Sequence, residues 1–141
     1  MTLQVAPNRP GREAVDFVVY LIIYAADIPV FFVEVKPGVA MRLLSARAAA
    51  DEQMRGRIEE LFDQSPSEIH GVSALGQKLC FYCYDKHTQT LTPQRIPRHP
   101  DIVTNTAPAD RWDTDIITDE GFDRFMDIVE HVKTLSVIEG V

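Results

Sequence analysis

Hydrophobic and polar positions near the N-terminus follow the two-residue period of a β-strand. Residues 16–24 and 30–36 are rich in β-branched and aromatic side chains, and the turn-forming segment AADIP at 25–29 separates them. A short edge strand at 3–6 and a turn at 7–11, marked by its Pro and Gly content, come before them. The first part of the chain therefore predicts a β-hairpin preceded by an edge strand.

The period changes to that of a helix after Pro37 and Gly38. Apolar residues then recur every three or four positions from about residue 40 to residue 64, which predicts a long helix with Gly56 as its weak point. The positions expected to face the core are Leu44, Ala48, Met54, Ile58, Leu61 and Phe62.

Charged residues occupy much of the rest of this helix. The basic residues are Arg42, Arg47, Arg55 and Arg57, and the acidic residues interleaved with them are Asp51, Glu52, Glu59 and Glu60. This mixture predicts a solvated, ion-paired helix face rather than a basic binding patch.

The second half of the chain predicts an antiparallel meander. Strands are expected at 69–75, 78–85 and 90–96, with a Gly-Gln turn between the first two. Residues 97–113 are rich in Pro, Asp, Asn and Thr, which is typical of a long surface loop.

A final helix is expected from residue 118 to about residue 135. Thr118 is the expected N-cap, and acidic residues follow it in the first turn, where they favour a helix start. The residues expected on its buried side are Phe122, Phe125, Met126, Val129 and Val132.

The composition suits one compact α+β domain that spans residues 1–141. With 45% hydrophobic and 25% charged residues, a chain of this length can bury a core without disulfides. The longest apolar run, at 17–26, is shorter than the roughly 18 to 20 residues that a membrane-spanning helix requires. The N-terminus lacks the basic and apolar regions of a secretory signal, so we expect an intracellular protein.

The cysteines and histidines show no metal-binding spacing. Cys80 and Cys83 form a C-x-x-C motif, but residues three apart on a strand point to opposite faces, which predicts core or half-buried cysteines. The four histidines are scattered and are expected in turns and on the surface; they are His70, His87, His99 and His131.

Two opposite charges interrupt the strand at 30–36. Glu34 and Lys36 share one face with Val30 and Phe32, and Asp16 begins the neighbouring strand of the hairpin. Because antiparallel neighbours lie about 5 Å apart, we expect Asp16 to lie close to Glu34. Two carboxylates and an amine at one sheet edge suit the hydrolysis of phosphodiesters with Mg²⁺ or Mn²⁺.

A plain ion pair at the strand end is the alternative interpretation. If exposed, such a pair would contribute less than about 1 kcal/mol. Both charges nevertheless lie in an apolar strand, where burial without a partner costs several kcal/mol, and this favours a functional use.

At these residues the chain resembles the PD-(D/E)XK superfamily, the restriction-endonuclease-like nucleases. Its signature is an acid that begins one strand and an acid-x-Lys on the next, here Asp16, Glu34 and Lys36. The resemblance implies a mixed sheet flanked by helices, in the order helix, three strands, helix, strand. It also implies that Asp16, Glu34 and the carbonyl of Val35 bind Mg²⁺, that Lys36 orients water or stabilises charge, and that Gln53 matches a Gln of many members.

Two further stretches resemble nuclease-like proteins that are expanded in fungi. They are GVSALGQKLCFYCYD at 71–85 and RWDTDIITDEGFDRF at 111–125, and this likeness implies no known activity.

The chain also departs from the family pattern. Members usually begin with a helix that carries a Glu, but only 15 residues precede Asp16, so we expect this helix to be missing. Glu13 is the only acid upstream, and Val15 occupies the position of the motif's Pro.

A second functional class therefore stays open, a non-catalytic nuclease-fold module that acts through protein association. A sheet without its N-terminal helix would expose apolar surface, which predicts a homodimer or a fragment of a larger protein. The formal net charge of −7 predicts weak binding of nucleic acid in either case.

Overall fold

The computed structural model describes residues 2–6, 18–25, 28–64 and 67–138. Its long helices are α1 (Leu44–Leu61) and α2 (Asp119–Ile138), and short 3₁₀ helices lie at Gly38–Arg42, Phe62–Gln64 and Ala109–Arg111. The strands are β1 (Thr2–Ala6), β2 (Val18–Ala25), β3 (Ile28–Lys36), β4 (Glu68–Leu75), β5 (Lys78–Asp85), β6 (Thr90–Thr92) and β7 (Thr114–Asp115).

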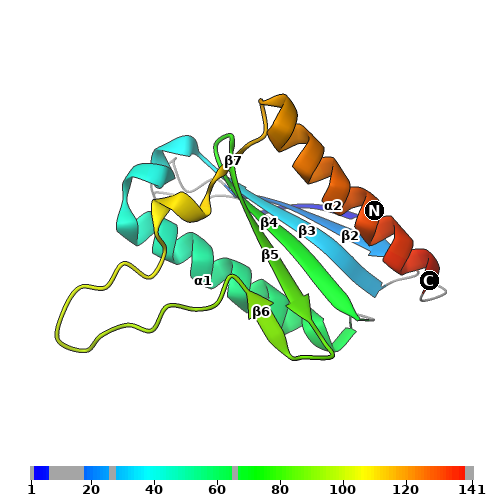
Figure 1. Cartoon of the computed structure of the whole chain (residues 1–141), viewed down its shortest axis with the longest axis horizontal. Coiled ribbons are helices and arrows are strands. Elements are labelled where there is room, and N and C mark those ends of the chain that lie inside the picture. The colour runs from blue at the N-terminus through cyan, green and yellow to red at the C-terminus, as the bar shows by residue number, and fades with distance from the viewer. Residues whose placement is uncertain (1, 7–17, 26–27, 65–66, 139–141) are drawn as a thin grey trace.

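The described strands form one mixed sheet in the order β1-β2-β3-β4-β5-β6, and β7 pairs with β5 (Figure 1). β3 and β4 are parallel and α1 connects them, whereas the other described pairs are antiparallel. A parallel pair requires such a crossover, because a tight turn reverses the chain direction. The predicted α+β class with a mixed sheet is therefore confirmed.

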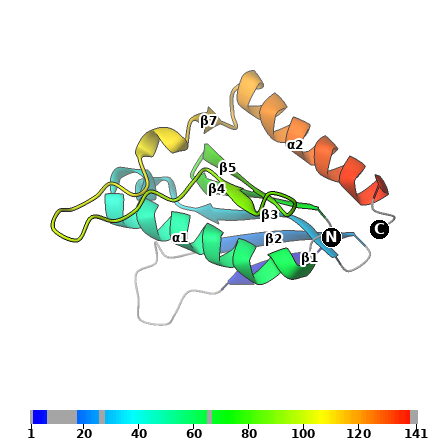
Figure 2. The same cartoon turned by 60° about the horizontal axis from the view of Figure 1, so that its bottom comes forward.

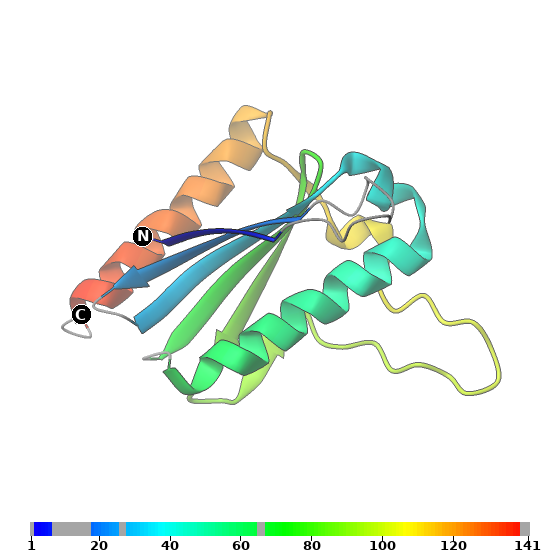
Figure 3. The same cartoon turned by 180° about the vertical axis from the view of Figure 1, so that it is seen from behind.

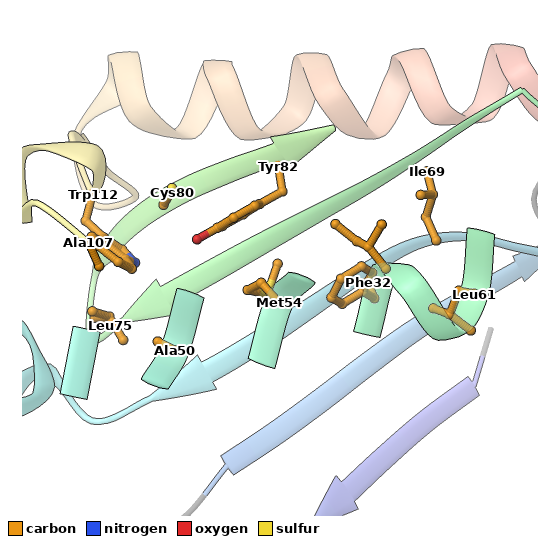
Figure 4. Close-up of a cluster of buried hydrophobic side chains, with 11 residues drawn as sticks. Phe32, Ala50, Met54, Leu61, Ile69, Leu75, Cys80, Tyr82, Ala107 and Trp112 are labelled. Carbon is orange, nitrogen blue, oxygen red and sulfur yellow. The ribbon is translucent and has the colours of Figure 1, made fainter. Parts of the chain in front are cut away.

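The two long helices lie on opposite faces of the sheet, as Figure 2 shows. Side chains alternate along β3, so that Phe32 packs in the core on the α1 side and Phe31 packs against Phe125 of α2. Figure 4 shows the α1-side core. Its buried members are Phe32, Ala50, Met54, Ile58, Leu61, Ile69, Leu75, Cys80, Tyr82, Ala107 and Trp112.

Most predicted elements are confirmed, with small changes in length. The first hairpin, the helix after it, the Gly-Gln turn and the final helix all form. The N-cap is also confirmed, because the Thr118 hydroxyl accepts a hydrogen bond of 3.0 Å from the backbone N–H of Gly121. In the Gly-Gln turn, Gly76 has a φ of 62°, and a Cβ there would lie 2.8 Å from the Cα of Gly38.

Two predictions about the second half were wrong, and a third was only partly right. The strand expected at 90–96 ends at Thr92, because Pro93 has no backbone N–H to extend the ladder. The segment expected as a surface loop at 97–113 projects beyond α1 in Figure 3, but it also buries Ala107 and Trp112 in the core. Phe122, expected on the buried side of the last helix, is 52% exposed.

The prediction of a solvated, ion-paired face on α1 was right about ion pairs, such as that of Arg57 with Glu60, but wrong about solvation. Arg55 is buried and donates 3.0 and 2.8 Å hydrogen bonds to the Asp51 carboxylate and the Pro93 carbonyl. Arg47 donates to the carbonyls of Met41 and Ala107, at 2.7 and 2.9 Å. These arginines therefore hold the long segment after β6 against α1, because buried carbonyl oxygens require donors.

The expectation that an N-terminal helix is missing concerns residues 7–17, which lie outside the described part of the chain. On the face opposite α1, α2 packs against residues of β3, β4 and β5. The buried members of that second cluster are Phe31, Val72, Ala74, Leu79 and Val132. The sheet was expected to expose an apolar face, but α2 covers the face over these three strands.

Candidate functional site

Glu34 lies in the interior of the protein, on the α1 side of the sheet. Its side chain is 1% exposed, and neither carboxylate oxygen has a hydrogen-bond partner among the described residues. In the sheet, Glu34 pairs with Tyr20 of β2 and Ser73 of β4. The buried Ser73 hydroxyl accepts a 3.3 Å hydrogen bond from the Trp112 indole N–H.

The electrostatic environment of Glu34 combines burial with nearby positive charge. Burial raises the pKa of the Glu34 carboxyl above its ordinary value, and the charges of Lys36 and Arg57 oppose this rise. A buried carboxylate without a hydrogen-bond donor is costly, so the group must take up a proton or gain a cation. A cation bound to Glu34 would therefore stabilise its ionised form.

Lys36 and Gln53 are two further residues of the site that the sequence predicted. Lys36 is half-buried and follows it on the same face of β3, as predicted. Gln53 is exposed on α1, one helical turn before Arg57, whose charge reaches Glu34.

The remaining two predicted ligands are the carbonyl of Val35 and the carboxylate of Asp16. Val35 points to the opposite face and is 37% exposed, so only its backbone belongs to the predicted metal site. Asp16 lies outside the described residues, two positions before β2, so the predicted contact between Asp16 and Glu34 stays a prediction.

A second buried carboxylate, Asp51 of α1, has partners that Glu34 lacks. The Tyr82 hydroxyl donates a 2.7 Å hydrogen bond to Asp51 Oδ1, and Arg55 Nε donates one of 3.0 Å to Oδ2. Arg111 Nη1 lies 3.9 Å from Oδ1. These donors therefore compensate the charge of the Asp51 carboxylate, and its hydrogen bond with Tyr82 joins α1 to β5.

A group of potential metal ligands lies on the other face of the sheet. Glu68 and His70 are neighbours on one face of β4, and His131 reaches them from α2. Glu68 Oε1 lies 2.9 Å from His70 Nε2 and 3.2 Å from His131 Nε2, and the three atoms are within 4.8 Å of one another. Donor atoms at such separations can bind one metal ion.

Two predictions about these residues were wrong. His70 is buried in a strand, and together with His131 it belongs to a cluster, whereas scattered turn and surface histidines were expected. The two histidines are 61 positions apart, so no local spacing could have revealed the cluster. The weak signal that existed was Glu68-x-His70, because residues two apart on a strand share a face.

The cysteines behave as the sequence predicted. Cys80 is buried in the α1-side core, whereas Cys83 is half-buried on the opposite face, where its Sγ lies 3.8 Å from His70 Nε2. Burial raises the pKa of each thiol to about 11. Burial therefore favours the neutral form of each thiol in the metal-free protein, and the two side chains lie on opposite faces of the sheet.

The pKa values within the Glu68 cluster reflect mutual hydrogen bonding. Burial acts to raise the pKa of Glu68, but hydrogen bonds from His70 and His131 bring it below its ordinary value. Burial lowers the pKa of His70, against the opposing effect of Glu68. A carboxylate and a neutral imidazole are the protonation states that metal binding requires.

A pocket of about 490 Å³ lies between α1 and β6, away from both groups. Its lining residues are Arg55, Ile58, Glu59, Phe62, Tyr84, Gln89, Thr90, Leu91, Gln94 and Arg95. Both of its arginines already pair with acids, Arg55 with Asp51 and Arg95 with Glu52. The charges of these two arginines are therefore already compensated by carboxylates.

Comparisons of the chain with protein-family models, with curated proteins and with solved structures found no match. Among the described residues, α1 and α2 are too polar or too short to cross a membrane.

Proposed function

We propose that this protein is a metal-dependent phosphodiesterase of the restriction-endonuclease-like class, with Glu34 and Lys36 at its centre. The observation that carries the proposal is the Glu34 carboxylate, which is 1% exposed and has no hydrogen-bond partner among the described residues. Native proteins rarely leave a buried carboxylate in this state unless an ion or a reaction uses it.

The order of the elements supports the proposal. β1, β2 and β3 form an antiparallel series, α1 follows, and β4 returns parallel to β3. This is the order of three strands, helix and strand that the resemblance implies. It places the end of β3, with Glu34 and Lys36, beside the start of β2, which Asp16 precedes by two residues.

The residues present fit a hard divalent cation. Neither Glu34 oxygen has a hydrogen-bond partner among the described residues, and carboxylate oxygens are the ligands that Mg²⁺ and Mn²⁺ prefer. Asp16 and Glu34 would hold the ion together with the carbonyl of Val35. When bound, the ion supplies charge neutralisation at the phosphate and a more acidic water.

The remaining side chains act on the substrate and the water. Lys36 lies on the same face as Glu34, so its ammonium group can orient a water molecule or neutralise negative charge that develops on the phosphate. We assign Gln53 a role as a further hydrogen-bonding group for this water, because it lies one helical turn before Arg57, whose charge acts on Glu34. The substrate class is nucleic acid, bound weakly because the chain carries a net charge of −7.

The test measures metal binding and cleavage together. At low ionic strength, Mn²⁺ or Mg²⁺ should raise the melting temperature and permit slow cleavage of single- or double-stranded DNA or RNA. Glu34→Gln and Asp16→Asn should remove both responses. Lys36→Ala should lower cleavage by about 100-fold or more and retain metal binding, since the amine is not a ligand.

Matched controls use charges elsewhere on the surface. Glu59→Gln on α1 and Lys133→Ala on α2 remove exposed groups of the same kinds and should leave both responses unchanged. If the wild-type protein shows neither a metal-dependent melting temperature nor cleavage of any of these nucleic acids, the enzyme proposal fails.

The second candidate is a non-catalytic nuclease-fold module that acts through protein association. The observation in its favour is again the burial of Glu34, because a substrate phosphate cannot touch a carboxylate that is 1% exposed unless the residues that cover it move. A protein that binds no divalent ion at Glu34 but forms a stable complex with another protein or with itself would support this candidate.

A further inference from the structure

The cluster around Glu68 lies on the sheet face opposite Glu34 and does not take part in the proposed reaction. Glu68 and His70 lie on β4, Cys83 lies directly across from His70 on β5, and His131 lies on α2. The cluster therefore joins the β4–β5 hairpin to α2, which is distant from it in sequence. The inference drawn from it does not rest on the proposed function.

The separations of the donor atoms match those around a tetrahedral ion. Nitrogen and oxygen ligands about 2.0–2.1 Å from Zn²⁺ lie about 3.3 Å from one another. Glu68 Oε1 is 2.9 Å from His70 Nε2 and 3.2 Å from His131 Nε2. The two imidazole rings meet edge to face, with centroids 5.3 Å apart, so both present Nε2 to the same carboxylate oxygen.

Cys83 lies next to these three ligands, outside the group whose donor atoms are all within 4.8 Å of one another, and can supply a fourth donor. Its Sγ is 3.9 Å from Glu68 Oε1 and 3.8 Å from His70 Nε2. A sulfur at about 2.3 Å from Zn²⁺ would lie about 3.5 Å from the other ligand atoms. A shift of a few tenths of an ångström would bring Cys83 to that separation from these two atoms, and such a shift lies within ordinary side-chain motion.

The chemistry of the donors selects the metal. Two imidazoles, one thiol and one carboxylate form a set that binds Zn²⁺ and similar transition metals, whereas Mg²⁺ prefers oxygen ligands alone. The side chains of Glu68 and His131 are 27% and 45% exposed, so an ion can enter from solvent, while His70 is only 8% exposed.

We propose that Glu68, His70, Cys83 and His131 form a zinc site that fastens α2 to the sheet. One ion would replace the hydrogen bonds among these side chains with bonds to a shared centre. Because β4, β5 and α2 each supply a ligand, occupancy stabilises the position of α2 against the sheet, as any ligand of the native state does.

The test titrates the whole chain, freed of metal, with Zn²⁺ and with Co²⁺. We expect one ion per chain, a higher melting temperature with Zn²⁺, and the intense visible absorption that tetrahedral Co²⁺ shows. A thiolate-to-Co²⁺ charge-transfer band in the near ultraviolet should report coordination by Cys83.

The decisive variant is His131→Ala, because this partly exposed residue can be removed with little effect on the core. We expect it to weaken Zn²⁺ binding by about 100-fold or more and to remove the Zn²⁺-dependent rise in melting temperature. His131→Asn serves as a second variant if the first folds poorly. Cys83→Ser should remove the charge-transfer band and weaken binding less than His131→Ala does.

His87→Ala is the matched control, since His87 is an exposed histidine in the turn between β5 and β6. It should bind Zn²⁺ as the wild type does, and so should Glu34→Gln, which keeps this test independent of the proposed reaction. The proposal is overturned if the wild-type chain binds no Zn²⁺ at micromolar concentration, or if His131→Ala and His131→Asn bind it with wild-type affinity.

Discussion

Glu34 and Asp51 are both buried on the α1 side of the sheet, and the difference between them is the number of donors that each accepts. Asp51 receives hydrogen bonds from Tyr82 and Arg55, so its charge is compensated within the protein. Glu34 has no hydrogen-bond partner among the described residues and relies on the more distant charges of Lys36 and Arg57. Donors within the protein compensate the charge of Asp51, which gives it a structural role. Glu34 lacks such donors among the described residues and is therefore available to a cation.

At the residue scale, Glu34→Gln should stabilise the metal-free protein at high pH. Burial raises the pKa of Glu34 in the folded state above its ordinary value of 4.5, so ionisation of Glu34 opposes folding. The wild type should therefore lose stability relative to the variant as the pH rises above about 4.5. Thermal melts in chelator from pH 4 to pH 8 should show a gain of a few degrees for the variant that disappears at the acid end.

Glu59→Gln is the control for this pH series, because Glu59 is an exposed carboxylate on the same helix. A gain for Glu34→Gln that is equal at pH 4 and pH 8, or equal to that of the control, would contradict the assignment of Glu34 as an uncompensated buried acid.

The hydrogen bonds around Asp51 predict that removing the carboxylate itself destabilises the protein more than removing one of its donors. Tyr82→Phe removes one hydrogen bond to a charged group and should lower the free energy of unfolding by about 1.5–3 kcal/mol. Asp51→Ala leaves the buried guanidinium of Arg55 without its carboxylate and should cost more, about 3–5 kcal/mol. Urea unfolding measures both, and Tyr84→Phe on the same strand, where the tyrosine is only half-buried, should cost less than Tyr82→Phe.

At the element scale, the periodicity of the sequence predicted which strands and helices form but not which charged residues they bury. The spacing of Met54, Ile58 and Leu61 predicted α1, and all three are in the core. Asp51 and Arg55 lie on the same side of that helix, but a sequence pattern treats charged residues as solvated. Their burial depends on Tyr82, which comes from a strand that no local pattern places beside α1.

Of the two candidate sites, the sequence could predict one and not the other. Glu34 and Lys36 could be predicted because strand alternation fixes their face, whatever the rest of the chain does. The Glu68 cluster could not be predicted, because His131 reaches β4 only through the packing of α2 on the sheet. Long-range packing of this kind leaves no periodic signal in one sequence.

Gly56 is a weak point in α1 that an alanine should strengthen. It lies inside the helix, and a Cβ there would meet no atom within 4 Å. Gly56→Ala should therefore raise the free energy of unfolding by about 0.5–1 kcal/mol, since alanine loses less backbone entropy in a helix. Urea unfolding measures this gain. Gly71→Ala is the opposite control, because its Cβ would lie 2.7 Å from the Phe32 ring, and it should destabilise the protein.

At the scale of the whole molecule, the expectation of a homodimer rests on the edge of the sheet. β1 is the first strand in the order and pairs only with β2 among the described strands. α2 covers the face over β3, β4 and β5, which removes part of the apolar surface that had suggested association. An edge strand with free backbone groups can still pair with a second chain.

We therefore expect a dimer that forms through β1 at high protein concentration. Sedimentation equilibrium over a wide concentration range should show a mass that rises toward twice that of the chain. A single mass equal to one chain at millimolar concentration would exclude the dimer and leave the monomer as the working unit.

The parallel pairing of β3 with β4 also bears on the order in which the chain folds. β4 and β5 meet across a two-residue turn, whereas Phe31 and His70, which pair across β3 and β4, are separated by roughly 40 residues that include α1. The entropy lost on closing the short loop is much smaller, so the β4–β5 hairpin should form early and β3 should join it late. In kinetic experiments, substitutions in that hairpin should change the folding rate, and substitutions in β3 should change mainly the unfolding rate. Glu34 would then enter its buried position in one of the last steps of folding, when α1 is already available to cover it.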